Sequence, residues 1–377
     1  MELMHEMQPA VQRLVDLVKA NGWQDKFEEA IATVASYNVP DLAYLTDFDS
    51  YIDWLNGLAV WAPDTLGTQR VTYEKVTQFY FVLDQEPLKS LQSKVQPGNE
   101  GKPLTPLSQW IIDFDNAWGS YLDTPPSVVH VEDFKANPLF QWDEFEAPPS
   151  GYFTFNQFFA RHMKPGQRPI ASIADDSVIT SPADCTFVDY WEVDNDSNIL
   201  VESKGLQWSI QELLKDSEYA DEFAGGIFTH SFLNTNDYHR WHTPVAGTVL
   251  ESRIVAGQVS LDIEATPGPV VDGKQTHELS ILDGTGYQFV QTRGLIVIDS
   301  PIGLVACLPM GMWPVSSVVI TADKGVTVHK GEELGYFAFG GSDFVMVFQR
   351  KSNVLLNGRP GKHVRTGTCI GYAHPNL

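Results

Sequence analysis

A change in the spacing of apolar residues along the chain constrains the fold more than any other feature. Early in the chain apolar residues recur at helical spacing, as in residues 11–18 between Pro9 and Gly22. From about residue 178, short β-branched runs alternate with glycine and proline, as in "GTVLESRIVAGQVSLDI". The sequence therefore predicts an α+β protein with a helical N-terminal part, residues 1–149, and a mostly antiparallel β domain, residues 150–377. One helix is expected within the β domain, near residues 208–216.

The net charge of the chain argues against two classes of binding partner. The chain has 25 basic and 48 acidic residues, a net charge of −23, which argues against nucleic acid and against an anionic membrane surface. No segment is long and apolar enough to span a bilayer, so stable membrane insertion is not expected. The first residues are acidic where a signal peptide would be basic, and the three cysteines fit no disulfide or zinc spacing. These features favour a cytoplasmic protein.

Three short stretches carry the residues of a catalytic site. They are "SPADCTF" with Asp184, "NDYHRWHTPVAG" with His239 and His242, and "FGGSD" with Ser342. Alone, each has an ordinary structural interpretation: a turn aspartate, a structural histidine pair and a loop serine. Together they supply a nucleophile, a base and a carboxylate that could orient the base.

Two familiar interpretations fit these stretches poorly. A serine hydrolase would carry its serine in a G-x-S-x-G elbow, but Phe344 stands where the last glycine should be. A metal site would need a third ligand, and none with a recognisable zinc spacing accompanies His239 and His242.

A serine that follows two glycines allows a different reaction. Its hydroxyl can attack the preceding carbonyl carbon, so that an ester replaces the amide. β-Elimination from the ester cuts the chain and leaves a dehydroalanine, and tautomerisation with loss of ammonia then gives a pyruvoyl group. The ketone of such a group is an electron sink like that of a pyridoxal cofactor.

The motifs resemble those of the phosphatidylserine decarboxylase family of pyruvoyl enzymes. The similar stretches occur in order: "TFNQFFARHMKPGQRPI" (154–170), "SPADC" (181–185), "DYHRWHTPVAG" (237–247) and "KGEELGYFAFGGS" (330–342). The resemblance implies self-cleavage between Gly341 and Ser342, which gives a β chain and an α chain that stay together, and a covalent pyruvoyl cofactor made from Ser342. It also implies a homodimer.

The resemblance assigns roles to the four site residues. Asp184, His242 and Ser342 match the family's self-processing triad, in which Asp184 orients His242 and His242 deprotonates the serine. His239 matches the histidine of the decarboxylation step. Residues 330–342 also resemble the glycine-rich hairpin of lipoyl- and biotin-carrier folds, although no lysine occupies the tip.

Other features of the resemblance bear on substrate and rate. The helical N-terminal part is similar to the subgroup that includes fungal tryptophan decarboxylases, which act on a free amino acid. Cys185 stands where the family commonly has glycine, and Asp343 stands where it usually has serine or threonine. A carboxylate at Asp343 could slow oxyanion formation by like-charge repulsion or could relay protons.

The sequence thus predicts a decarboxylase that acts on a free, aromatic amino acid through a Schiff base with the ketone at position 342. Phosphatidylserine decarboxylation and a non-catalytic binding protein are the alternatives. The candidates to line an apolar pocket, with core packing as the alternative, are Trp241, Phe337, Phe339 and Phe344. The basic cluster that could meet a carboxylate or phosphate, or pair with the acidic surface of the protein, is Arg161, Lys164 and Arg168.

Overall fold

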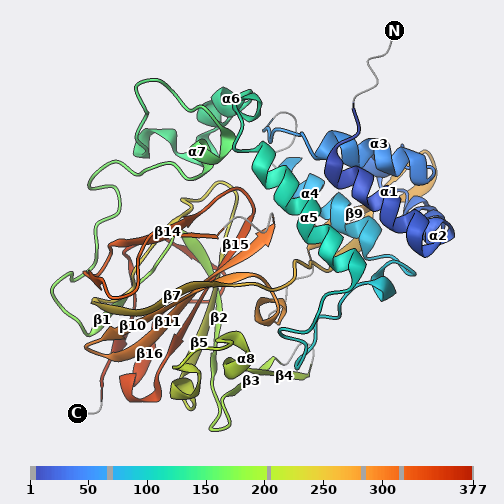
Figure 1. Cartoon of the computed structure of the whole chain (residues 1–377). Coiled ribbons are helices and arrows are strands. Elements are labelled where there is room, and N and C mark those ends of the chain that lie inside the picture. Colours follow the sequence, from blue (N-terminus) through green and yellow to red (C-terminus); the bar gives the residue numbers. More distant parts are fainter. Residues whose placement is uncertain (1–5, 66–70, 202–204, 282–285, 314–317, 376–377) are drawn as a thin grey trace.

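The computed structural model describes residues 6–65, 71–201, 205–281, 286–313 and 318–375, and confirms the α+β prediction (Figure 1). The α-helices are α1 (Pro9–Asn21), α2 (Gln24–Ser36), α3 (Phe48–Leu58), α4 (Val71–Leu83), α5 (Pro106–Tyr121), α6 (Val131–Ala136), α7 (Phe155–Phe159) and α8 (Ile210–Leu213). Helix α1 begins at Pro9 and ends at Gly22, whose φ of 64° is a left-handed conformation that glycine adopts without strain. Helix α8 lies where the sequence predicts the helix of the β domain.

The main sheet has eight strands, and each neighbouring pair is antiparallel. Its order is β13-β7-β10-β11-β15-β5-β2-β17. The bounds, in that order, are Thr327–Val328, Gly247–Val255, Arg293–Ser300, Gly303–Trp313, Gly341–Phe348, Ile227–Leu233, Cys185–Glu192 and Lys362–Val364. Strand β15 therefore has a partner on each side, and these partners are β11 and β5.

Smaller sheets surround the main one. One joins β12 (Val318–Ile320), β14 (Glu333–Phe337) and β6 (Arg240–His242). Another joins β1 (Val178–Thr180), β18 (Cys369–Ala373) and β16 (Val354–Leu356). Two hairpins complete the set: β3 (Asn198–Val201) with β4 (Leu206–Ser209), and β8 (Ile263–Val271) with β9 (Lys274–Ile281).

The two strands before and after Gly340 do not pair with each other, so the predicted carrier-like hairpin around Ser342 is wrong. Its two arms form strands β14 and β15, as their aromatic, alternating sequences suggest. However, β14 pairs with β12 and β6, whereas β15 pairs with β11 and β5. The glycines before Ser342 thus connect two sheets, and the serine lies buried near the start of a central strand.

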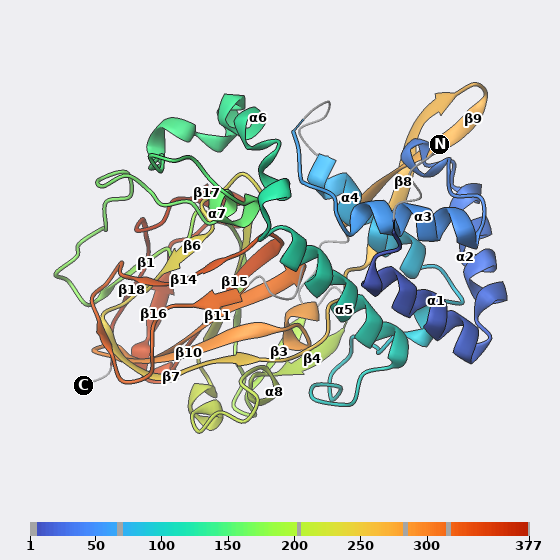
Figure 2. The same cartoon turned by 45° about the horizontal axis from the view of Figure 1, so that its top comes forward.

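The hydrophobic core of the helices continues past the predicted boundary at residue 150, which itself stays a prediction. Phe155, Phe158 and Phe159 of α7 belong to this core, and so does Phe339, which lies just before β15. The β8–β9 hairpin leaves the β region and packs against α4 (Figure 2). The helical part therefore packs directly against the segment that precedes Ser342, through Phe339. We call this core, with its helices and α7, the helical core.

Candidate active site

Ser342 occupies a buried position where the main sheet fixes the backbone on both sides. It pairs in register with Gly311 of β11 and Leu233 of β5. Its hydroxyl oxygen is 3.5 Å from the carbonyl oxygen of Gly340, at the long limit for a hydrogen bond. The hydroxyl group is thus lightly held and lies against the backbone just before the predicted cleavage site.

His239 is brought to the start of β15 by two contacts. Its Nε2 lies 2.9 Å from the carbonyl oxygen of Asn234, the residue that follows Leu233. The backbone carbonyl of His239 accepts a 2.8 Å hydrogen bond from Phe337 at the end of β14. The imidazole ring stacks on Phe159, with 3.9 Å between ring centroids.

The surroundings of His239 favour the neutral imidazole, in which the acceptor nitrogen Nδ1 has no hydrogen-bond donor among the residues described. Because a carbonyl oxygen only accepts, Nε2 carries the hydrogen, and Nδ1 is buried without a hydrogen-bond partner among the residues described. Burial, reinforced by the nearby charge of Arg161, lowers the pKa of His239 to about 3. Nδ1 is therefore placed to receive a proton.

This lowered pKa predicts a pH dependence of stability. Between pH 6.5 and about pH 3, the unfolded state binds a proton at His239 that the native state does not. Stability from this group is complete above pH 6.5 and is lost as pH falls, by at most about 1.4 kcal/mol per pH unit. We expect His239→Gln to flatten this decline, measured by urea unfolding across that range.

The exposed His329→Gln serves as the matched control for this experiment. Other acid-sensitive groups are common to all three proteins, so the difference in slope isolates His239. An unchanged slope in His239→Gln would contradict the assignment.

Asp184 is held as a buried carboxylate by partners that the sequence analysis did not foresee. Arg168 donates to both of its oxygens, with Nε at 2.9 and 3.1 Å, and Thr366 donates to Oδ1 through its backbone N–H and its hydroxyl. Burial raises the pKa of Asp184, but the hydrogen bonds and charge of Arg168, with the Thr366 bonds, outweigh it and lower the pKa overall.

His242 lies near Asp184 but is not hydrogen-bonded to it among the described residues. Its backbone N–H donates to the carbonyl of Pro182 at 2.7 Å. Nδ1 lies 2.9 Å from the carbonyl oxygen of Gly331, and Nε2 lies 3.2 Å from the hydroxyl of Tyr238. Burial lowers the pKa of His242, while the charge of Asp184 acts in the opposite direction.

The predicted site residues are connected through charge and through strand pairing. The charge of Asp184 acts on both His242 and His239. His239 also contacts the residue that follows the strand partner of Ser342. Among the residues that the structure describes, no hydrogen bond links the predicted triad from end to end. The planar fork of Arg168 is a better partner for an ionised carboxylate than a neutral imidazole. The catalytic roles of the four residues stay predictions.

The basic cluster is used inside the protein. Arg168 also contacts Glu144 at 2.7 Å, and Lys164 donates to the carbonyl of Asp143 at 2.7 Å. Arg161 is buried, with its guanidinium 4.0 Å from the ring centroid of Phe145. Arg168 therefore pairs with an acid, as expected, but its main partner is the buried Asp184 and not an acid of the surface.

The four aromatic pocket candidates are buried packing residues. The ring of Trp241 lies 5.9 Å from that of Phe337 and 6.0 Å from that of Phe344. Phe339 belongs to the helical core instead. None of the four lines either of the cavities described next, so the structure supports core packing for them.

A cavity of about 700 Å³ adjoins the site. Tyr152, Phe153 and Tyr336 contribute aromatic rings to its lining, and Arg240 lies over the ring of Tyr336 at 4.7 Å. The lining also includes Asn156 and Ala160, which flank the position of Phe159 in the chain, and Phe159 stacks on His239. This cavity is the candidate substrate pocket.

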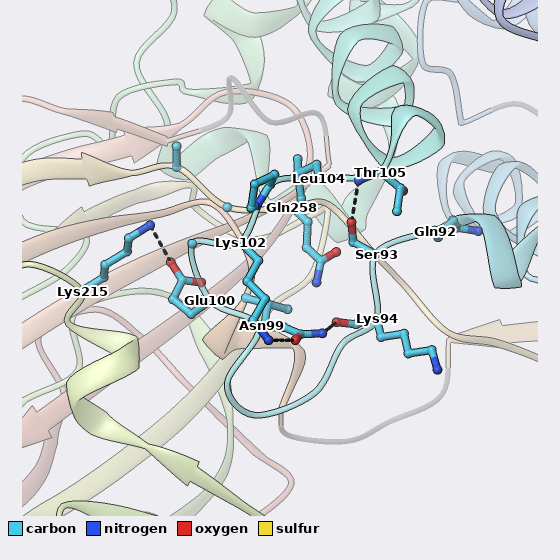
Figure 3. Close-up of a pocket in the computed structure, with 15 residues that line it drawn as sticks. Gln92, Ser93, Lys94, Asn99, Glu100, Lys102, Leu104, Thr105, Lys215 and Gln258 are labelled. Atoms are coloured by element: carbon cyan, nitrogen blue, oxygen red, sulfur yellow. Dashed lines mark hydrogen bonds and ion pairs between the residues drawn. The ribbon is translucent and has the colours of Figure 1, made fainter. Parts of the chain in front are cut away.

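A second cavity, of about 390 Å³, lies between residues 92–105 and Lys215 (Figure 3). Its acidic group is already neutralised, since Glu100 lies 3.7 Å from Lys215 and 3.5 Å from Arg293. None of the four predicted site residues lines either cavity. The larger cavity is the better candidate for the substrate, because its lining includes Arg240, the chain neighbour of His239, and Ala160, the chain neighbour of Phe159.

A buried polar cluster on the other face of β15 was missed from the sequence. Oδ2 of Asp343 accepts hydrogen bonds from the hydroxyl of Tyr287 and from the amide of Gln288 at 3.1 Å. Nε2 of His230 lies 3.2 Å from the same oxygen. The unusual Asp343 was the one available signal, because its partners are far away in sequence: His230 lies on the neighbouring strand β5, and Tyr287 and Gln288 lie in a short turn of helix before β10.

Comparison with known proteins gives the class of protein that this fold and site define, which is a decarboxylase and thus a carboxy-lyase. Residues 155–372 match the phosphatidylserine decarboxylase family, and this span contains Asp184, His239, His242 and Ser342. The chain belongs to the phosphatidylserine decarboxylase family.

Relatives come from fungi, a plant and bacteria. Decarboxylase iboD of Amanita muscaria is 31% identical over 69% of this chain and 82% of its own length. Phosphatidylserine decarboxylase proenzyme 3 of Schizosaccharomyces pombe is 34% identical over 61% of this chain but only 22% of its own length. The proenzyme of Fusobacterium nucleatum is 29% identical over 66% of this chain and 75% of its own. Two of these names describe proteins made as precursors.

Proposed function

We propose that this protein is a self-processing, pyruvoyl-dependent decarboxylase that converts a free aromatic L-amino acid into an amine and carbon dioxide. The observation that carries the proposal is the buried Ser342 after two glycines, in a family whose members include proenzymes. Its lightly held hydroxyl lies against the backbone of Gly340, close to the carbonyl that it would attack. The residues present therefore fit a pyruvoyl group made at this position.

A pyruvoyl group supplies a ketone that accepts electrons as carbon dioxide leaves the substrate. The overall reaction consumes one proton, which must reach the α-carbon. His239 is the residue that would carry it, because its Nδ1 is an unused acceptor. Asp184 and His242 would act earlier, on the hydroxyl of Ser342.

The candidate pocket supports a small aromatic substrate. Its volume of about 700 Å³ is within the usual range for small-molecule sites. Tyr152, Phe153 and Tyr336 offer ring faces to such a substrate, whereas the charge of Arg240 is already paired with Glu333 at 2.9 Å. No helix among the described residues is long and apolar enough to cross a membrane, and the net charge of −23 disfavours an anionic lipid surface.

Phosphatidylserine is the second candidate substrate. It is favoured by the names of most of the relatives, which are phosphatidylserine decarboxylase proenzymes. We further propose that the processed chains stay together, that the enzyme is a homodimer and that it works in the cytoplasm. Native mass measurement of the purified protein tests the first two of these proposals.

Intact mass under denaturing conditions is the experiment that tests the proposed function. We expect two chains, residues 1–341 and residues 342–377, the second carrying a ketone that borohydride reduces. Carbon dioxide release from free amino acids and from phosphatidylserine vesicles then identifies the substrate. A single chain of 377 residues would contradict the proposal and favour the binding-protein alternative.

A further inference from the structure

We infer that the helical core positions the peptide bond between Gly341 and Ser342 for cleavage, through two buried anchors. Phe339 holds the chain before the bond, and Asp343 holds it after the bond. The inference rests on the proposed self-cleavage and gives the helical part of the chain a task in it.

The first anchor fixes both the ring and the backbone of Phe339. The ring lies 5.9 Å from that of Trp118 on α5, and 5.3 Å from those of Phe155 and Phe159 on α7. The backbone N–H of Phe339 donates a 2.9 Å hydrogen bond to Oδ1 of Asn156. Residues of two helices therefore hold the chain two positions before Gly341.

Asn156 is itself fixed in place. Its amide donates to Oδ1 of Asp123 at 2.9 Å, and the side chain is buried. Because the amide N–H is used in this way, Oδ1 is oriented toward Phe339. A rigid acceptor limits where the backbone before the cleavage site can lie.

The second anchor is Asp343 with its polar partners. Oδ2 of Asp343 accepts hydrogen bonds from Tyr287 and Gln288 and contacts Nε2 of His230, and the whole Asp343 side chain is buried. The ring of Tyr287 packs against the helical core. Asp343 is the residue directly after Ser342, and through Tyr287 it is linked to the same helical core that holds Phe339.

The packing of the core does not explain why residue 343 is an aspartate and not an apolar residue. The next residues on that face of β15 are Val345 and Val347, which are buried in an apolar cluster. Oδ1 of Asp343 is also buried, and it has no hydrogen-bond partner among the described residues. Burial of a carboxylate with an unpaired oxygen costs stability, so an apolar residue would serve the sheet better.

Cleavage would separate the two anchors, which gives them different expected effects. Before the cut, Phe339 and Asp343 act on the same peptide bond. After it, Phe339 belongs to the β chain, whereas Asp343 remains next to the residue that carries the ketone. Loss of the Phe339 anchor should therefore slow cleavage alone, and loss of the Asp343 anchor should slow both cleavage and turnover.

The test follows precursor conversion by mass spectrometry after a short pulse of synthesis of the full chain. We expect Phe339→Ala and Asp343→Leu each to slow cleavage by about ten- to a hundredfold, the size of effect that a misplaced reacting group produces. Asp343→Asn keeps an acceptor for Tyr287 and Gln288 and should restore most of the rate. Phe339→Leu replaces Phe339→Ala if the latter does not fold.

Matched controls separate positioning from loss of stability. Phe27→Ala removes a ring from the helical core that contacts Phe48 and Tyr51, and Val345→Ala removes a buried side chain from the same face of β15. Both should lower Tm yet cleave at the wild-type rate. Equal slowing in controls and anchor variants, or wild-type rates in the anchor variants, would overturn the inference. An uncut wild-type protein would instead contradict the proposed function.

Discussion

Ser342→Ala is expected to accumulate as a single uncut chain without decarboxylase activity. The variant lacks both the hydroxyl that attacks the Gly341 carbonyl and the oxygen that would leave in β-elimination, so no ketone can form at position 342. Because the hydroxyl makes a single, long hydrogen bond among the residues described, its loss should cost no more than about 1 kcal/mol of unfolding free energy. Intact mass and thermal unfolding on the same sample check both statements.

Ser231→Ala is the matched control for this variant. Ser231 is also buried, on the neighbouring strand β5, where it pairs in register with Phe344. The control should be cut and active. If the Ser342→Ala protein were cut between residues 341 and 342, or released carbon dioxide, the pyruvoyl mechanism would be excluded.

His239→Ala is expected to be cut normally but to decarboxylate about 10²–10⁴-fold more slowly, the usual contribution of a positioned proton donor or acceptor. His239 contacts Asn234, the residue after the strand partner of Ser342, and its Nδ1 has no hydrogen-bond partner among the residues described. Single-turnover release of carbon dioxide by the cut protein measures the effect. His239→Gln can still donate to the Asn234 carbonyl, so it tests whether loss of that bond contributes.

The opposite result would also be informative. Full activity in His239→Ala would remove this histidine from the chemistry. A protein that stayed uncut would mean that His239, not His242, deprotonates Ser342. The structure makes that exchange of roles a real alternative, since it places His239, and not His242, next to the neighbours of Ser342.

Local patterns were enough to predict some elements of the fold, such as α1 and α8, but not how the strands pair. The helical spacing and the proline and glycine signals correctly placed α1, and the β-branched runs gave a mostly antiparallel region. The carrier-like hairpin of residues 330–342 was wrong in its strand pairing because turn residues and strand-like arms do not specify which strands meet. The partners of β14 and β15 come from segments that lie far away in the sequence.

The same limit applies to the candidate site. Asp184, His239, His242 and Ser342 were chosen by chemical role and motif order, which are properties of the sequence. The partners of Asp184, and the cluster around Asp343, depend on burial and strand register. These long-range contacts could be found only in the folded chain.

The central place of β15 has a mechanical consequence for a protein cut just before it. The segment 342–377 would retain the rest of β15, held between β11 and β5, and would also supply β17 to the main sheet and β16 and β18 to the sheet of β1. Release of this segment would require its hydrogen bonds to several strands to break at the same time. The two pieces would therefore unfold as one cooperative unit. Exchange of the 342–377 segment between molecules would be as slow as global unfolding.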